Sequence, residues 1–161
     1  FFVDFSSQQC TEEFQRAFVE RVNFYRAKHG VGPLTLDRSI SGWAQEWADR
    51  LGREGHMYHR QPNKYGENIA EMIGGREMSA EFAVDMWYGE VGRYTAYGRE
   101  PDFSSFLNWG HFTQLVWKGS RAVGVGCGRS ADGLYQFVVG NFDPPGNMMG
   151  DFANNVFPPS G

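Results

Sequence analysis

Residues 122–127 alternate between bulky and small side chains, and this pattern constrains the fold more strongly than length or composition does. The run is Ala122-Val123-Gly124-Val125-Gly126-Cys127. Because successive side chains of a β-strand point to opposite faces, the pattern predicts a strand with one bulky face and one bare face. Gly133 follows as a turn signal, and residues 134–142 are predicted to form the partner strand of a β-hairpin. Residues 143–147 have the composition of a turn.

The first half of the chain shows helical periodicity instead. Thr11 is a predicted N-cap, because its hydroxyl can accept a hydrogen bond from an orphan backbone N–H. Apolar residues then follow at helical spacing, namely Phe14, Phe18, Val22 and Tyr25. Gly30 and Pro33 are predicted to end this helix.

Two further amphipathic helices are predicted. Asp37 caps the second and Gly52 marks its end, and its apolar stripe is Ile40, Trp43, Ala44, Trp47, Ala48 and Leu51. The third begins at Ser79 and ends near residues 91–92, with an apolar face of Phe82, Ala83, Met86 and Trp87. Helices first and strands later predict one α+β domain with helices packed on a mainly antiparallel sheet.

Composition narrows the class of protein. The 161 residues suit one domain, and 14 Phe, 5 Trp and 7 Tyr require burial, which excludes disorder as the main state. The net charge is −4 and no basic run is present, so nucleic acid is not an expected partner. No apolar stretch reaches the ~18 residues that span a bilayer. Residues 1–5 are too short, and lack the basic flank, for a signal peptide.

The four histidines have different contexts. His29 lies at the predicted end of the first helix, where a cation suits the helix dipole, so we expect a structural role. His56 follows the second helix and is expected at the surface. His59 and His111 are far apart in sequence, and each alone is more often structural than a ligand. Spacing by itself does not establish a shared site.

Two glutamates and two cysteines are the remaining candidates for a functional or structural site. Glu67 has a turn-like context. Glu90 lies on the third helix beside apolar positions, either at a solvated edge or turned into a cleft, since a carboxylate on an apolar face is costly unless it is paired. Cys10 and Cys127 can form one bridge or remain two thiols, and their spacing fits no zinc ribbon.

Four motifs give the chain a recognisable pattern. They are Gly110-His111-Phe112-Thr113-Gln114-Leu115-Val116-Trp117-Lys118-Gly119-Ser120, Val139-Gly140-Asn141-Phe142-Asp143-Pro144-Pro145-Gly146-Asn147, Gly66-Glu67-Asn68-Ile69 and Asn23-Phe24-Tyr25-Arg26. Together they resemble the CAP superfamily of cysteine-rich secretory, antigen 5 and pathogenesis-related 1 proteins, over residues 11–157. The family usually has Cys where Gly140 stands and His where Val22 stands. The missing Cys at Gly140, with only two cysteines in the chain, makes the sequence similar to the Cys-poor, Golgi-associated branch.

The resemblance implies a fold and a site. The fold is a three-layer α–β–α sandwich around a small antiparallel sheet, in which helices can pack closely on the bare face of residues 122–127. The site is a cleft tetrad, His59, Glu67, Glu90 and His111, with His56 as the alternative to His59. Its two imidazoles can bind Zn²⁺ and leave coordination positions open. The carboxylates can then orient the imidazoles.

The resemblance also implies a binding or effector module whose partner is a lipid or sterol. A membrane surface and a homodimer are further partners that it allows. Residues 92–109 are predicted as an aromatic-rich loop that either covers the core or grips a lipid, through Tyr94, Tyr97, Phe103, Phe106 and Trp109.

Two alternatives to lipid binding stay open. One is a protease-like or esterase-like hydrolase that uses the same cleft, with Ser104, Ser105 or Thr113 as nucleophile, although none lies in a nucleophile-elbow pattern. The other is a secreted defence-type or venom-type protein that acts through protein–protein contacts. A secreted protein is expected, with the cytosolic face of Golgi membranes as the alternative, and no enzyme activity is assigned.

Overall fold

The computed structural model describes residues 10–160, so residues 1–5, which are expected not to be a signal peptide, lie outside the described part. Its centre is a four-stranded sheet in the order β1 (Thr35–Leu36), β3 (Ala122–Arg129), β4 (Tyr135–Asp143) and β2 (Gly66–Ile73). β3 pairs with β4 and β4 with β2, both antiparallel, whereas β1 pairs with β3 in parallel. The predicted hairpin and the mainly antiparallel sheet are therefore confirmed, and β2 forms an edge of the sheet.

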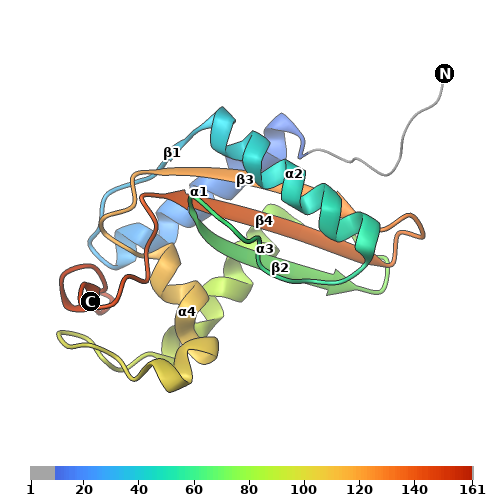
Figure 1. Cartoon of the computed structure of the whole chain (residues 1–161). Helices are drawn as coiled ribbons and strands as arrows, with labels where there is room; N and C mark the ends of the chain where they lie inside the picture. The colour runs from blue at the N-terminus through green and yellow to red at the C-terminus, as the bar shows by residue number, and fades with distance from the viewer. Residues whose placement is uncertain (1–9, 161) are drawn as a thin grey trace.

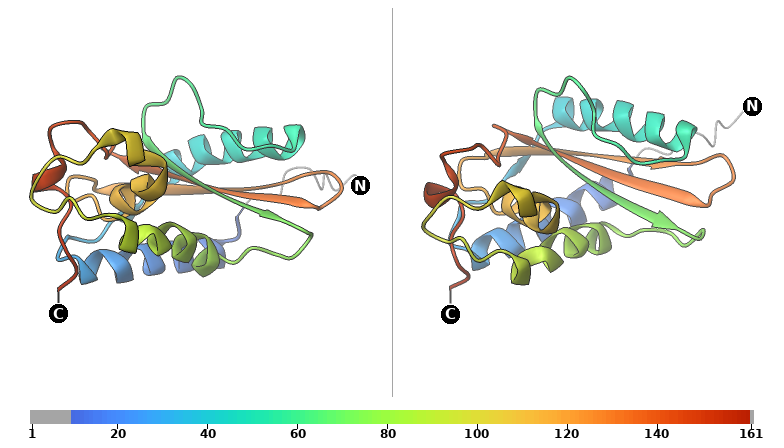
Figure 2. Two further views of the ribbon diagram at one scale, coloured as in Figure 1. Left: turned by 90° about the horizontal axis from the view of Figure 1, so that it is seen from below. Right: turned by 60° about the horizontal axis from the view of Figure 1, so that its bottom comes forward.

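Helices cover both faces of this sheet (Figure 1). α2 (Arg38–Glu54) packs on one face, and α1 (Glu12–Lys28), α3 (Ala80–Tyr88) and α4 (Phe106–Leu115) lie on the other, as the turned views in Figure 2 show. Short 3₁₀ helices follow α3 at Gly89–Arg93, precede α4 at Phe103–Ser105, and occur near the C-terminus at Phe152–Asn154. The expected three-layer α–β–α sandwich is confirmed.

The bare face of β3 lies against α2. A Cβ atom built on Gly126 would lie 2.5 Å from the carbonyl carbon of Ala44, and one on Gly128 would lie 2.0 Å from the carbonyl oxygen of Ala48. The helix backbone therefore sits directly on the strand, which only glycine allows. The bulky residues Val123 and Val125 point the other way, into the core shared with α1, α3 and α4.

Each of the three predicted helices begins directly after its predicted N-cap residue. The side-chain oxygens of Thr11, Asp37 and Ser79 each accept hydrogen bonds from backbone N–H groups of the first turn. The predicted end of α2 is wrong: the helix continues through Gly52 to Glu54 and is capped by Gly55 at φ 72°. Gly52 has a packing role instead, because a Cβ there would lie 2.6 Å from the carbonyl oxygen of Arg129.

The predicted apolar face of the third helix is partly wrong. Ala83 and Trp87 are buried, but Phe82 and Met86 are each 44% exposed. The helix itself ends at Tyr88, and the following 3₁₀ turn carries the chain on to Arg93. The prediction of a loop over residues 92–109 is also wrong from Phe103 onward, since that segment enters a 3₁₀ turn and then α4.

Cys10 and Cys127 form a disulfide that joins the segment before α1 to β3. This settles the question that the sequence left open in favour of one bridge. Between residues 10 and 160, no helix is both long enough and apolar enough to cross a membrane.

Candidate functional site

The first half of the candidate site comes from the segment between α2 and β2 and from the start of β2 itself. Nδ1 of His59 lies 2.8 Å from Oε1 of Glu67, and the same oxygen accepts the N–H of Arg60 at 3.1 Å. Oε2 of Glu67 accepts from Nδ2 of Asn63 at 3.0 Å. The Glu67 side chain is only 4% exposed, whereas the His59 ring is 59% exposed. A buried carboxylate thus holds a solvent-facing imidazole.

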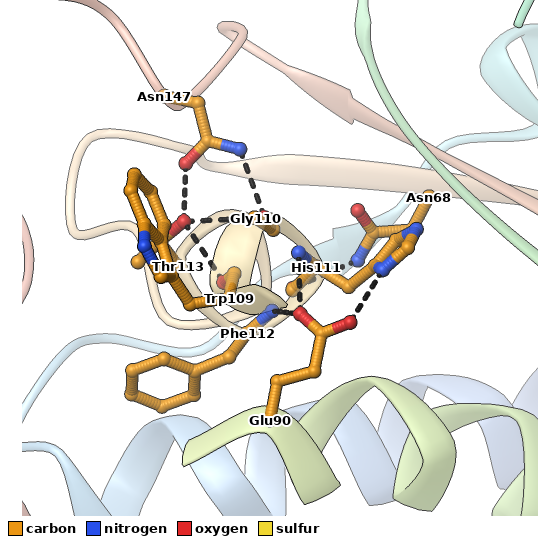
Figure 3. Close-up of polar contacts among 8 residues, drawn as sticks. All are labelled: Asn68, Glu90, Trp109, Gly110, His111, Phe112, Thr113 and Asn147. Carbon is orange, nitrogen blue, oxygen red and sulfur yellow. Dashed lines mark hydrogen bonds and ion pairs between the residues drawn. The ribbon is translucent and has the colours of Figure 1, made fainter. Parts of the chain in front are cut away.

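The second half comes from the opposite helical layer (Figure 3). Glu90 lies in the 3₁₀ turn after α3, and its Oε2 is 2.7 Å from Nδ1 of His111 on α4. Oε1 of Glu90 accepts two backbone N–H groups, from His111 at 2.9 Å and from Phe112 at 3.1 Å. Glu90 is 8% exposed, so the structure supports a carboxylate turned into a cleft rather than a solvated edge.

The two halves follow one local design. In each, a carboxylate binds Nδ1 of a histidine and the backbone N–H of the next residue, Arg60 in one case and Phe112 in the other. Because a carboxylate only accepts hydrogen bonds, Nδ1 carries the ring proton in both pairs. With Nδ1 as the donor, Nε2 is the ring nitrogen that carries a free lone pair whenever the imidazole is neutral.

A small pocket connects the halves at the edge of the sheet. Its volume is about 50 Å³ and its lining is His59, Glu67, Asn68, Phe106, Leu107, Gly110, His111 and Asn147. β2 is the edge strand, so the pocket lies where the segment that follows α2 meets α4 across the start of β2. The pocket is thus lined by residues of both His–Glu pairs.

Comparison with known proteins agrees with this architecture. The family model of the CAP, or cysteine-rich secretory protein, family matches residues 19–142. The chain belongs to the CAP family. The human Golgi-associated plant pathogenesis-related protein 1 is 32% identical over 157 residues, which cover 94% of this chain and 97% of that protein. The expected likeness to the Golgi-associated branch is thereby confirmed.

One further relative and one solved structure extend the comparison. Secreted protein RBT4 of Candida albicans is 37% identical over 150 residues, which cover 91% of this chain but only 39% of that longer protein. The crystal structure of NaASP2 with Zn²⁺ superposes with a TM-score of 0.73 at 22% identity and covers 98% of this chain and 90% of that one. At this identity the structural match shows the shared fold.

The CAP domain brings all four residues of the expected tetrad together in two pairs. His56 is not part of them: it is exposed and stacks on Tyr58 with ring centroids 4.9 Å apart. His29 has the expected structural role, but the expected reason is wrong. It is 2% exposed, its Nδ1 donates to the Phe157 carbonyl at 2.7 Å, and burial lowers its pKa, which works against the charged form that the helix dipole would favour.

The aromatic segment proposed for lipid contact lies mostly in the core. Tyr94 is 3% and Trp109 is 2% exposed, so neither presents a surface to a ligand. Tyr97, Phe103 and Phe106 are partly buried and pack on the same core. The exposed apolar side chain of this region is Leu107, at 91%, which sequence reasoning missed.

The candidate nucleophiles do not reach the imidazoles. Thr113 is fully buried, and its hydroxyl donates to Oδ1 of Asn147 at 2.6 Å. The hydroxyl of Ser105 donates to the Asp102 carbonyl, and Ser104 is exposed. In the part of the chain that the structure describes, neither His59 nor His111 has a hydroxyl or thiol partner. The geometry supplies bases but no nucleophile paired with them.

Asn63, Asn68 and Asn147 are further polar residues of the site that sequence reasoning did not single out. Asn68 directly follows Glu67, and Asn147 ends the second motif, so the motifs held a usable signal for both. Asn63 lies in a polar stretch with no motif, and nothing in the sequence indicates that it reaches Glu67.

Proposed function

We propose that this CAP domain is a binding module whose pocket takes a divalent cation, Zn²⁺, through Nε2 of His59 and of His111. The observation that carries the proposal is that a carboxylate holds Nδ1 of each of two histidines that line one pocket, so that Nε2 of each ring is the nitrogen left to bind a ligand. Imidazoles oriented by a carboxylate on the far nitrogen are the usual arrangement of protein zinc ligands.

The donor set fits an open site. Over residues 10–160, no three side chains of His, Cys, Asp or Glu come together as a metal-binding group, so the protein supplies two imidazoles. Zinc takes four ligands in most sites, which leaves positions for water or for a ligand. When bound, zinc supplies Lewis acidity at those positions. Glu67 and Glu90 orient the rings, and their negative charge attracts a cation to the pocket.

Calorimetric titration with Zn²⁺ at neutral pH tests this proposal. Wild type should bind one equivalent, and the His59→Ala/His111→Ala double variant should lose the heat. His56→Ala, which changes an exposed histidine outside the pocket, is the matched control and should bind like wild type. Binding that survives the double variant, or that disappears with His56→Ala, would place the metal elsewhere.

A second proposed function is binding of a neutral lipid such as a sterol, in a groove between the starts of α1 and α3. The groove holds about 340 Å³ and its floor is apolar, formed by Phe14, Ala17, Met78 and Ala80. Its edge carries Glu13, Glu77 and Glu81, which disfavour a carboxylate or phosphate headgroup. The pocket lined by His59 and His111, at about 50 Å³, is too small for a sterol.

Uptake of radiolabelled cholesterol separates the two possible lipid sites. Ala17→Trp fills the groove and should abolish uptake, whereas Ala27→Trp, at an exposed position of the same helix, should not. Loss of uptake in a Phe103→Ala/Phe106→Ala variant together with normal uptake by Ala17→Trp would move the site to the aromatic segment. Biological activity that survives every one of these changes, and the double histidine change, would favour a protein–protein contact.

The disulfide is evidence about the cellular compartment in which the protein resides. Disulfides persist in oxidising compartments and are rare in the cytosol. The Cys10–Cys127 bridge therefore supports an extracellular or luminal CAP domain over one on the cytosolic face of Golgi membranes. Thiol-specific mass labelling of the protein recovered from its own cells tests this proposal: no labelled cysteine is expected, and two labelled cysteines would contradict it.

A further inference from the structure

The two peptide groups that flank the Cα atom of His111 are bonded to side chains from outside α4 at all four of their polar atoms (Figure 3). In the first peptide, the Gly110 carbonyl accepts from Nδ2 of Asn147 at 2.9 Å, and the His111 N–H donates to Glu90 at 2.9 Å. In the second, the His111 carbonyl accepts from Nδ2 of Asn68 at 3.0 Å, and the Phe112 N–H donates to Glu90 at 3.1 Å.

These contacts are unusual for positions inside a helix. In an α-helix, such N–H and C=O groups bond to residues four positions away in the same helix. Here the side-chain partners belong to three other elements: Glu90 to the 3₁₀ turn after α3, Asn68 to β2, and Asn147 to the segment after β4. The position of His111 is therefore set by the tertiary structure as well as by its own helix.

Asn147 has the most specialised geometry of the three partners. Its φ is 57°, and among the non-glycine residues of the segment 10–160 it alone has a positive φ. Asparagine tolerates this left-handed region better than most residues, yet the conformation still costs energy. Such strain persists where the surrounding contacts hold it, and here both atoms of the side-chain amide are bonded to α4.

Thr113 fixes which way the Asn147 amide points. A hydroxyl has one proton, and its shortest acceptor is Oδ1 of Asn147 at 2.6 Å, against 3.1 Å to the Gly110 carbonyl. With Oδ1 occupied by that donor, Nδ2 faces the Gly110 carbonyl. Asn147 also lines the pocket that holds His59 and His111.

We propose that Asn147 is a positioning residue for His111. Asn147 holds the carbonyl of the Gly110–His111 peptide, while Glu90 accepts a hydrogen bond from the N–H of the same peptide. Together these two contacts fix the backbone from which the His111 ring enters the pocket. The ring then presents Nε2 to the pocket before any ligand arrives. This inference rests on the proposed cation site for its consequence, but the positioning itself can be measured without metal.

Three variants separate positioning from folding. Asn147→Gly keeps access to the left-handed backbone and removes the amide. Asn147→Asp keeps the shape but sets a carboxylate oxygen against the Gly110 carbonyl. Thr113→Val removes the hydroxyl that orients the amide and leaves Asn147 itself in place. The matched control is Asn155→Ala, since Asn155 accepts the Gly119 N–H at 2.9 Å outside the pocket and has a structural role.

Two readouts decide the question. NMR-detected hydrogen exchange of the His111 and Phe112 amides, without metal, should become faster by about tenfold or more in the Asn147 and Thr113 variants, relative to amides of β3 and β4. Zinc affinity should fall by about tenfold in the same variants, as for other residues that orient a metal ligand. Asn155→Ala should lower thermal stability and leave both the local exchange and the zinc affinity at wild-type values.

The outcomes are distinct. Unchanged local exchange in Asn147→Gly and Thr113→Val overturns the positioning role, whatever zinc does. Faster exchange in a protein whose wild type binds no zinc supports positioning and rejects the proposed function. If neither Asn147 variant folds, Thr113→Val alone decides, because it replaces a buried hydroxyl by a methyl group of similar size.

Discussion

Arg26 shows how much one residue contributes to the stability of this domain. It is 1% exposed, and its guanidinium donates to four carbonyls, those of Gly32, Leu115, Trp117 and Ser120. No carboxylate faces it in this set, and burial lowers its pKa to about 10. Two of the acceptors lie at or just beyond the C-terminal end of α4, where the helix dipole favours a cation.

Arg26→Met should therefore lower the free energy of unfolding by about 3 kcal/mol or more, because it leaves several buried carbonyls without a donor. Arg26→Lys should recover only part of this loss, since a compact ammonium cannot reach four carbonyls spread around a planar fork. Urea denaturation monitored by tryptophan fluorescence measures both. A loss below 1 kcal/mol in Arg26→Met would contradict this account of the helix motif that contains Arg26.

His29 should make stability depend on pH. Its folded-state pKa lies below the ordinary value of 6.5, mainly because the ring is buried against Phe157 and Tyr88. The unfolded chain therefore binds a proton more readily than the folded one. The contribution of His29 is fully present above about pH 6.5 and is lost as the pH falls through the lower folded-state pKa.

Urea unfolding measured from pH 7.5 down to pH 4.5 tests this sign. His29→Gln should flatten the acid side of the stability profile, whereas His56→Gln, at an exposed ring, should leave the slope unchanged. The sequence predicted a structural role for His29 but could not show burial, which depends on the arrival of Tyr88 and of the C-terminal segment.

At the scale of elements, the glycines of β3 set the distance between α2 and the sheet. Gly126→Ala places a Cβ 2.5 Å from both the carbonyl carbon of Ala44 and the amide nitrogen of Gln45, and these are backbone atoms that cannot rotate away. The expected loss in the free energy of unfolding is about 3 kcal/mol. Gly42→Ala is the control: no atom lies within 4 Å of its Cβ, and an alanine inside α2 should stabilise by about 1 kcal/mol.

Thermal denaturation of Gly126→Ala and Gly42→Ala measures both effects, and equal effects would refute the close packing of α2 on β3.

The helices and strands also show which elements the sequence could predict. α1, α2, α3 and the hairpin were predicted because caps, periodicity and the alternation of β3 are local signals. α4 was missed because it begins without a side-chain cap and contains Gly110, and β2 because Gly66–Ile73 mixes polar and apolar residues without alternation.

At the scale of the whole molecule, the candidate site depends on the order of the layers. His59 and Glu67 come from the end of the α2 layer and the edge strand, and Glu90 and His111 from the opposite layer. No spacing rule connects residues 59 and 111, so only the family motifs could join them in advance. The two Glu–His pairs, the pocket and the bonds to both peptides of His111 are products of tertiary structure, and no local pattern indicates them.

The disulfide constrains the whole chain, because its two cysteines are 117 positions apart. Closing so large a loop reduces the entropy of the unfolded state, so Cys10→Ser/Cys127→Ser should lower the free energy of unfolding by about 3–5 kcal/mol. The pocket should be unaffected, since neither cysteine lines it or bonds to a residue that does. Zinc titration and urea denaturation of this double variant measure the two effects separately. A large fall in zinc affinity at a temperature where the variant is fully folded would show that the bridge shapes the pocket, and a loss of stability below 1 kcal/mol would show that α1 and the sheet stay together without it.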